Sequence, residues 1–208
     1  MCEDCWSKVR PHRSSICPSC GRFFEGAGES HLCRACANER PSFSIHRSCG
    51  KYAGTLKDLI LLYKYRRYSI LGRRLAHFAF QAVGGDEELW RGVNAVVPVP
   101  LHPRRKRERG FNQAKVFSER LAKFKGLRPV DDALIKIRNV PPQTSLEAAD
   151  RAKNVRGAYL VKRDKGIGGK IILLADDVYT TGATIKECSR TLLEAGAKEV
   201  RAVTLAQA

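Results

Sequence analysis

The chain has 208 residues, of which 43% are hydrophobic, so it can bury a substantial core and is not composed like a disordered segment. No stretch approaches the roughly 20 apolar residues that span a bilayer, and the start, MCEDCWSKVRPHR, lacks the apolar run of a signal peptide. We therefore expect a cytoplasmic protein without a membrane span. The net charge of +17 favours a polyanionic partner, either nucleic acid or a phosphate-rich small molecule; a generally basic, solvated surface is the alternative.

The first 50 residues are rich in cysteine and poor in periodic apolar pattern. Seven of the eight cysteines lie within residues 1–49, which in a cytosolic chain favours a metal site over disulfides. Two Cys-x-x-Cys pairs separated by twelve residues have the spacing of a tetrahedral structural zinc site. Zinc would hold together a segment that is too rich in loops to bury a core. The candidate ligands are Cys17, Cys20, Cys33 and Cys36.

A third pair, Cys2 and Cys5, has no matching partner pair in the chain. Three interpretations stay open: half of a site, a substitute for one of the other pairs, or a metal shared with His12 or His31. The two isolated cysteines farther along the chain are expected to be small packing residues.

Helical periodicity follows the cysteine-rich segment. Thr55 and Asp58 have the spacing of a capping box, and the apolar residues that follow recur on one helical face as far as Tyr63. A short buried strand with two prolines is expected over 95–100. A second helix is expected over 112–126, where a glycine ends the periodic pattern.

The last third of the chain carries the clearest structural pattern. Residues 138–156 are polar and are expected to form a long mobile loop, followed by a strand over 157–161. A strand, a helix and a strand then follow over 170–175, 182–196 and 199–206, and strands joined in this way pair in parallel. We predict an α/β fold with an open, mostly parallel sheet and a small N-terminal zinc-ribbon-like module. The expected domains are 1–50 for the module and 51–208 for the α/β domain.

Two adjacent aspartates, Asp176 and Asp177, follow the buried strand in the stretch IILLADDVYTTGAT (171–184). In an open α/β sheet, ligands bind beyond the carboxyl ends of the strands. The turn after the pair offers backbone amides at a helix start, a glycine and threonine hydroxyls, which suit a phosphate. Carboxylates suit hydroxyl groups or a metal ion, so a ribose 5-phosphate fits both halves. The alternative is that one aspartate caps the helix and the other is solvated.

This stretch closely resembles the ribose-phosphate-binding signature of the type I phosphoribosyltransferases, which is a strand, an acidic pair and a T-T-G-x-T turn. Two further segments, 96–114 and 143–159, look like the ComF family. They read VVPVPLHPRRKRERGFNQA and QTSLEAADRAKNVRGAY. Members of that family are competence-associated and carry a phosphoribosyltransferase-like domain after a cysteine-rich zinc module. The resemblance covers nearly the whole chain.

The resemblance implies binding of phosphoribosyl pyrophosphate (PRPP) together with Mg²⁺. Asp176 and Asp177 would be the catalytic pair that meets the ribose 2- and 3-hydroxyls, and residues 143–154 would be a hood over the site. The sequence does not decide which of the nearby arginines would stabilise the leaving pyrophosphate. The residues expected to bind PRPP are Val178, Thr180, Thr181, Gly182, Ala183, Thr184, Leu101, His102 and Arg104.

A nucleic-acid function is the main alternative. Five basic residues fill six positions over 104–109, and a second basic group over 63–74 is interleaved with tyrosines. Cations beside aromatic rings suit single-stranded nucleic acid, although 63–74 could be a solvated helix face and 104–109 a pyrophosphate site. The family link to DNA uptake adds single-stranded DNA and uptake or recombination proteins as expected partners. The candidates are Lys64, Arg66, Arg67, Arg105, Lys106, Arg107 and Arg109.

Two functions from different classes therefore remain. The first is a transferase that uses PRPP, with an acceptor that the sequence does not name. The second is a non-catalytic protein that keeps the phosphoribosyltransferase scaffold and binds single-stranded DNA. A third hypothesis is that the zinc module docks a protein partner.

Overall fold

The computed structural model describes residues 3–26, 28–65, 70–139, 154–162 and 166–208. Most of the predicted loop over 138–156 and the candidates Arg66 and Arg67 lie outside the described residues. In the described part of the chain, no helix combines the length and the apolar character needed to cross a membrane. The elements are α1 (Glu3–Ser7), α2 (Arg34–Asn38), β1 (His46–Ser48), α3 (Gly54–Tyr65), α4 (Ile70–Val83), α5 (Glu87–Trp90), β2 (Ala95–Pro98), α6 (Pro103–Arg109), α7 (Gln113–Phe124), β3 (Arg128–Pro129), β4 (Leu134–Lys136), β5 (Tyr159–Val161), β6 (Ile171–Tyr179), α9 (Ala183–Glu194) and β7 (Glu199–Gln207).

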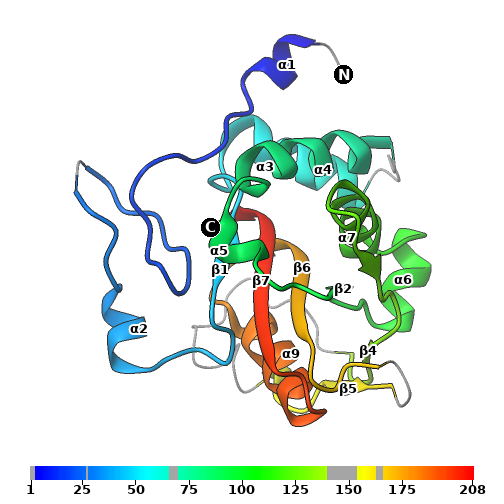
Figure 1. The fold of residues 1–208 in the computed structure, drawn as a ribbon. Coiled ribbons are helices and arrows are strands. Elements are labelled where there is room, and N and C mark those ends of the chain that lie inside the picture. Colours follow the sequence, from blue (N-terminus) through cyan, green and yellow to red (C-terminus); the bar gives the residue numbers. More distant parts are fainter. Residues whose placement is uncertain (1–2, 27, 66–69, 140–153, 163–165) are drawn as a thin grey trace.

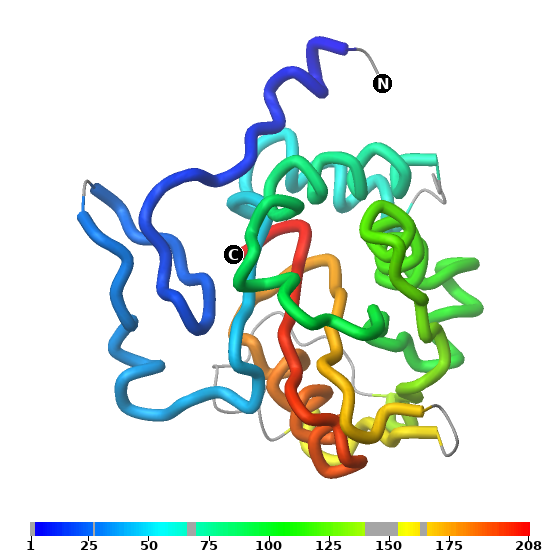
Figure 2. Tube along the Cα trace, viewed as in Figure 1, coloured from blue at the N-terminus to red at the C-terminus, as the bar shows by residue number. Residues whose placement is uncertain are grey.

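A five-stranded parallel sheet with the order β1-β7-β6-β2-β3 forms the centre (Figures 1 and 2). The predicted α/β class with a mostly parallel sheet is therefore confirmed, and β4 with β5 adds a separate antiparallel pair. Because the strands run in one direction, their carboxyl ends meet at one edge of the sheet. β2 pairs with β6 as far as Pro98↔Ala175, which brings the loop after β2 beside the acidic pair.

The parallel sheet reaches back into the cysteine-rich segment. β1 pairs with β7 from His46↔Ala202 to Ser48↔Thr204, and all three of its residues are buried. The sequence HRS carries no apolar signal for a buried strand, so periodicity does not reveal it. The domain boundary at residue 50 stays a prediction, but residues 46–48 already form part of the sheet.

Helices cover both faces of this sheet (Figure 1). Leu173 and Ala175 of β6 pack in the cluster that contains α3, α4 and α7, whereas Ile172 and Leu174 pack in the cluster that contains α9 and the buried cysteines. This alternation follows from the two-residue period of a strand. The predicted apolar face of α3 is buried as far as Tyr63.

Element boundaries differ from the sequence predictions at two places. α3 already begins at Gly54, so Thr55 lies inside the first turn and the predicted capping box is wrong. The strand expected over 95–100 ends at Pro98, in keeping with the missing N–H of Pro100. The helix expected over 112–126 is observed as α7, where Asn112 Oδ1 accepts a hydrogen bond from Ala114 N at 3.1 Å.

Candidate functional site

The acidic pair lies at the carboxyl end of β6, where successive side chains point to opposite faces of the sheet. Asp177 faces α3, and its Oδ1 lies 3.0 Å from Nζ of Lys64. Asp176 interacts electrostatically with Lys136 of β4 and Tyr159 of β5, on the side of α9. Asp176 Oδ1 also accepts a hydrogen bond from the backbone N–H of Asp177 at 2.8 Å. One edge therefore presents two carboxylates that have different neighbours.

The protonation of Asp176 is balanced near neutral pH. Burial raises the pKa of Asp176 to about 7, and the charge of Asp177 adds to the shift. The backbone N–H of Asp177 and the ammonium groups of Lys64 and Lys136 offset only part of it. A ligand that donates hydrogen bonds or brings positive charge would favour the ionised carboxylate. A perturbed carboxyl group at the ligand-binding edge of an α/β sheet is typical of a functional site.

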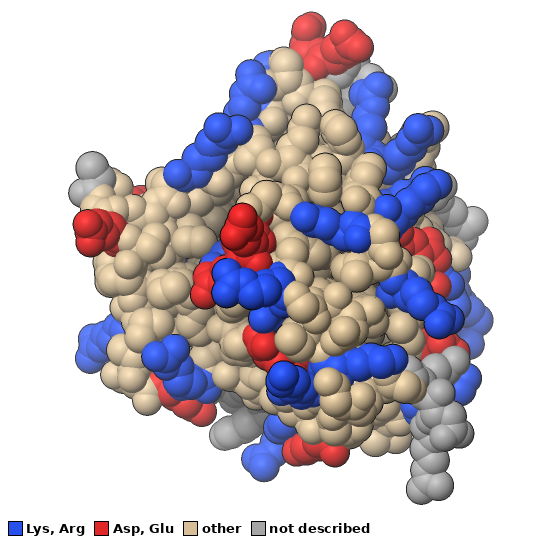
Figure 3. Space-filling model, viewed as in Figure 1, with Lys and Arg blue, Asp and Glu red and all other residues tan. Residues whose placement is uncertain are grey.

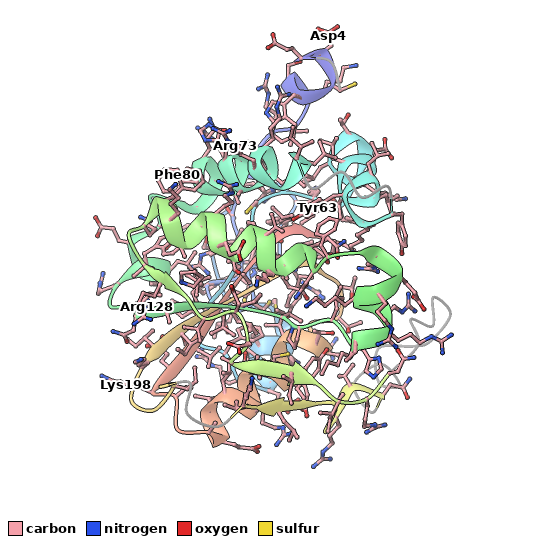
Figure 4. All side chains as sticks on the ribbon, turned by 90° about the vertical axis from the view of Figure 1, so that its right-hand side faces the viewer. Asp4, Tyr63, Arg73, Phe80, Arg128 and Lys198 are labelled. Atoms are coloured by element: carbon pink, nitrogen blue, oxygen red, sulfur yellow. The ribbon has the colours of Figure 1, made fainter. Side chains whose placement is uncertain are left out.

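Lys64 lies in surroundings that differ from the sequence interpretation. We grouped Lys64 with the nucleic-acid candidates, but its ammonium turns toward Asp177 and only 16% of its side chain is exposed. Burial works to lower the pKa of Lys64, but Asp177, together with Asp176 and Tyr52, outweighs burial and raises it. Lys64 is therefore a charged partner of the acidic pair in this structure and is not part of an exposed basic surface. Tyr63, the preceding residue, packs inward and donates to the carbonyl of Gln113 at 3.0 Å (Figure 4).

The turn after β6 leaves backbone amides available at the start of α9. Gly182 is the N-cap residue, with φ of 76°, and provides no side chain to cap the helix. Thr181 Oγ1 accepts from Ala183 N at 3.4 Å, while Thr180 is exposed and Thr184 is half-buried. The amides of the first turn beyond Ala183 and the positive end of the helix dipole favour an anion at this position. The geometry is what a phosphate-binding turn needs.

The loop after β2 lies beside the acidic strand, because Val99 N donates to Ala175 O at 2.9 Å. It continues through Leu101 into α6, where His102 Nδ1 accepts from Arg104 N at 3.3 Å. His102 thus caps α6. The guanidinium of Arg104 is exposed, with Nε 3.2 Å from Oε1 of Glu108. Contact of this loop with pyrophosphate stays a prediction.

The helix α6 presents much of the basic run to solvent. Lys106 and Arg107 are exposed, and the guanidinium carbon of Arg109 lies 5.3 Å from the ring centroid of Tyr65. Tyr65 as a whole residue is 63% exposed. Figure 3 shows Lys and Arg side chains gathered on the upper right of the molecule, where Figure 1 places α4, α6 and α7. A cation beside an exposed ring is suited to single-stranded nucleic acid, but this function also stays a prediction.

The two predicted cysteine pairs come together as one cluster. The ligand atoms of Cys17, Cys20, Cys33 and Cys36 all lie within 4.8 Å of one another, and Sγ of Cys20 and Cys33 are 3.6 Å apart. Four thiolates around a tetrahedral zinc ion stand about 3.8 Å apart, so the observed spacing fits such an ion. Gly21, with φ of 65°, forms the turn of the first pair. The four cysteines could therefore hold a metal such as zinc.

The surroundings of this cluster favour one deprotonated thiol. Burial works to raise the pKa of Cys17, but backbone N–H donors from Cys33, Cys20 and Ser19 outweigh it and lower this pKa to about 7. The amide of Cys33 lies 3.4 Å from Cys17 Sγ. Among the described residues this is the one cluster of possible metal ligands, and neither Cys5 nor the two candidate histidines belong to it. The rings of those histidines stack on Phe23 and Phe24.

His46 connects the cysteine cluster to the turn over 180–184. Its Nδ1 lies 2.7 Å from the carbonyl of Cys20, its Nε2 lies 2.9 Å from Thr204 Oγ1, and its ring stacks on Tyr179 at 4.2 Å. Burial lowers the pKa of His46 to about 4, so the ring is neutral at physiological pH. A cavity of about 720 Å³ next to this stack is lined by residues of both parts, including Cys36, Thr180 and Thr181.

Residues 112–208, which contain β6, the turn and β7, match the family described as Phosphoribosyl transferase domain. Competence protein F from Haemophilus influenzae is 27% identical to this chain and aligns with 100% of it and 90% of that protein. DNA utilization protein YhgH from Salmonella typhimurium is 30% identical, with 97% of this chain and 87% of that protein covered. Competence protein ComFC from Bacillus subtilis is 31% identical, with 99% and 83% covered.

The chain belongs to the ComF family. Membership confirms the resemblance in the sequence, and the fold agrees with a phosphoribosyltransferase-like domain behind a cysteine cluster. Sequence analysis of this ComF protein missed the roles of Lys64, His46 and Lys136. The three side chains come from segments remote in sequence from the residues they contact, and no spacing rule links such pairs. A buried polar strand such as β1 offers no signal either.

Proposed function

We propose that this protein binds PRPP with Mg²⁺ at the carboxyl edge of the sheet, as a phosphoribosyltransferase or as a sensor of that ligand. The main supporting observation is that Asp176 and Asp177 lie close to the start of α9, where Gly182 has no side chain to cap the helix. Asp176 and Asp177 would accept hydrogen bonds from the ribose 2- and 3-hydroxyls. The amides and hydroxyls over 180–184 would hold the 5-phosphate.

The proposed chemistry is displacement of pyrophosphate at ribose C1 by a nucleophile. The bond from C1 to the pyrophosphate oxygen breaks, and the bond to the acceptor forms. Positive charge develops on the ribose ring and negative charge on the leaving group, which the loop over 101–104 would stabilise. When bound, Mg²⁺ would neutralise phosphate oxygens, and carboxylate oxygens are the ligands it prefers. The chemical class of the acceptor is left open.

Titration calorimetry with Mg²⁺ and PRPP tests this proposal. We expect binding to the parent protein and at least a hundredfold loss of affinity in the double variant Asp176→Asn/Asp177→Asn, because two charged hydrogen-bond acceptors are lost. The double variant Asp131→Asn/Asp132→Asn serves as a control, because it replaces two consecutive aspartates that lie outside the proposed site. Equal affinity in parent and site variant would refute the assignment.

We further propose that the cysteine cluster holds one structural Zn²⁺. The spacing of its four sulfur atoms and the lowered pKa of Cys17 support this, since zinc binds thiolates. The ion would add stability to residues 3–45, where Val9, Phe43 and Ile45 are the buried apolar residues that the structure describes besides the cysteines.

A second candidate function is binding of single-stranded DNA, in uptake or recombination together with other proteins. The observation that favours it is the exposed basic face of α6 with Arg109 over Tyr65. The names of the relatives, competence protein and DNA utilization protein, agree with a role in DNA uptake. Both functions can coexist, because Lys106 and Arg107 of α6 are exposed, whereas Asp176 and Asp177 are only partly exposed at the end of β6.

Fluorescence anisotropy with a labelled oligonucleotide over a range of salt concentrations tests the DNA function. The variant Lys106→Ala/Arg107→Ala should bind at least tenfold more weakly at low salt, and its slope of log affinity against log salt should be shallower by about 1.4. The control Lys57→Ala/Lys198→Ala removes two exposed charges outside α4, α6 and α7 and should leave the slope unchanged. A parent affinity that is flat in salt would argue against this function.

A further inference from the structure

Lys64 is a buried cation held directly on the proposed ligand site. The apolar face of α3 packs onto the sheet, and this packing delivers the last turn of the helix to the carboxyl edge. Nζ of Lys64 is 3.0 Å from Asp177 Oδ1, with 16% and 14% of the two side chains exposed. The other charged or titratable groups that act on this ammonium are Asp176 and Tyr52.

The ammonium of Lys64 occupies Oδ1 of Asp177, one of the two carboxylate oxygens that a ligand could contact. An oxygen that accepts from an ammonium at 3.0 Å has less capacity left for a ribose hydroxyl or a metal ion. A divalent cation on the same carboxylate would also stand next to a positive charge in surroundings that screen it poorly. Separation of the pair would therefore free Oδ1 of Asp177 and move the ammonium away from an incoming cation.

We infer that Lys64 prevents free divalent cations from binding to Asp177 and leaves this carboxylate only when a metal arrives with a polyphosphate. We call this role of Lys64 the guard. The inference rests on the proposed function for its ligand class, a ribose carrying a diphosphate. Such a ligand brings negative charge that compensates the ammonium released from Asp177, whereas a free metal ion brings none. A lysine suits this exchange, because its charge is compact and its four-carbon stem is flexible.

The guard can be separated from a merely structural ion pair by measuring metal binding without PRPP. Electron paramagnetic resonance with Mn²⁺ as the probe reports the free ion directly. The variant Lys64→Met keeps the length and apolar stem of the side chain and should bind Mn²⁺ at least tenfold more tightly than the parent. The matched control Lys57→Met, on the exposed side of the same helix, should behave as the parent. The gain should vanish in Lys64→Met/Asp177→Asn.

The outcomes separate this inference from the proposed function. Unchanged Mn²⁺ affinity in folded Lys64→Met overturns the guard, even if the parent binds PRPP. Tighter Mn²⁺ binding in a protein that never binds PRPP keeps the guard and refutes the proposed function. If Lys64→Met does not fold, Lys64→Gln, which retains a donor for Asp177, carries the same expectation, and Mn²⁺ affinity unchanged in that variant also overturns the guard.

Discussion

The double substitution Cys17→Ser/Cys20→Ser should abolish zinc binding and lower the free energy of unfolding by several kcal/mol. The four sulfur atoms lie within 4.8 Å of one another, so the loss of two leaves too few ligands for a tetrahedral ion. Binding free energy at a structural zinc site is folding free energy, about 10–16 kcal/mol in isolated zinc-finger peptides. Part of the module is held by contacts with the sheet, so the loss should be smaller here.

Zinc content by mass spectrometry and thermal unfolding measure this effect. We expect one zinc per parent chain and none in the double variant. The control Cys188→Ala alters a buried cysteine of α9 outside the cluster and should keep its zinc. Zinc retained in the Cys17/Cys20 variant, but lost in a Cys2→Ser/Cys5→Ser variant, would move the metal site to the third cysteine pair.

The same variant should also weaken binding at the phosphate turn. Cys20 holds His46 through its carbonyl, and the His46 ring supports Tyr179 directly before the turn. If the loop around Cys17 and Cys20 moves, the neutral, buried imidazole of His46 loses one of its two hydrogen-bond partners, the carbonyl of Cys20. We therefore expect a chelator such as EDTA, removed before titration, to lower PRPP affinity together with zinc content. If the affinity remained full in the zinc-free protein, the two parts would be independent.

The strand, helix and strand near the end of the chain could be predicted from sequence because their information is local. The apolar run over 171–175 specifies a buried strand. The periodic residues over 182–196 specify an amphipathic helix, and Gly182 and Gly196 mark its ends. The turn over 180–184, the proposed phosphate site, is equally local, since Asp177 and Gly182 are five residues apart. The cysteine spacing is also local within each pair, so the sequence alone predicts the cluster.

The missing features are those created by tertiary contacts. Lys64 looked like part of a basic surface because its neighbours in sequence are basic, but its neighbour in space is Asp177. β1 is buried because it adds to β7 beneath the cysteine cluster, and its side chains find polar partners such as Thr204. No residue of β1 is apolar, so hydrophobic periodicity could not have placed it in the sheet.

Gly182→Ala should destabilise the turn over 180–184. Of the substitutions that add one methyl group to this turn, it should lower the free energy of unfolding the most. Gly182 has φ of 76°, which an alanine adopts only at a cost of about 1 kcal/mol, because its Cβ crowds the following carbonyl oxygen. An added Cβ would also lie 2.5 Å from Cζ of Tyr179. Overpacking of this kind costs roughly 1–3 kcal/mol, so the free energy of unfolding should fall by about 2–4 kcal/mol in total. Chemical denaturation measures the change.

Gly126→Ala is the matched control, because Gly126 has φ of 65° and open space where its Cβ would lie. It carries the backbone penalty without the clash, so the difference between the two variants isolates the contact with Tyr179. Gly182→Ala should also lower PRPP affinity at least tenfold, since the amides of the turn must move, whereas Gly126→Ala should not change it. Equal effects of both substitutions on stability and affinity would show that the turn relaxes freely.

The turn should not relax freely, because the Tyr179 ring is held from its other side. A flexible side chain would swing away from an added methyl group, but this ring stacks on His46, and His46 is fixed by Cys20 and Thr204. The strain from Gly182→Ala must therefore displace either the start of α9 or the loop around Cys20. The variant Tyr179→Leu/Gly182→Ala removes the ring, and a double-mutant cycle should show a coupling of about 1 kcal/mol or more. A coupling near zero would mean that Tyr179 does not carry strain between the two parts.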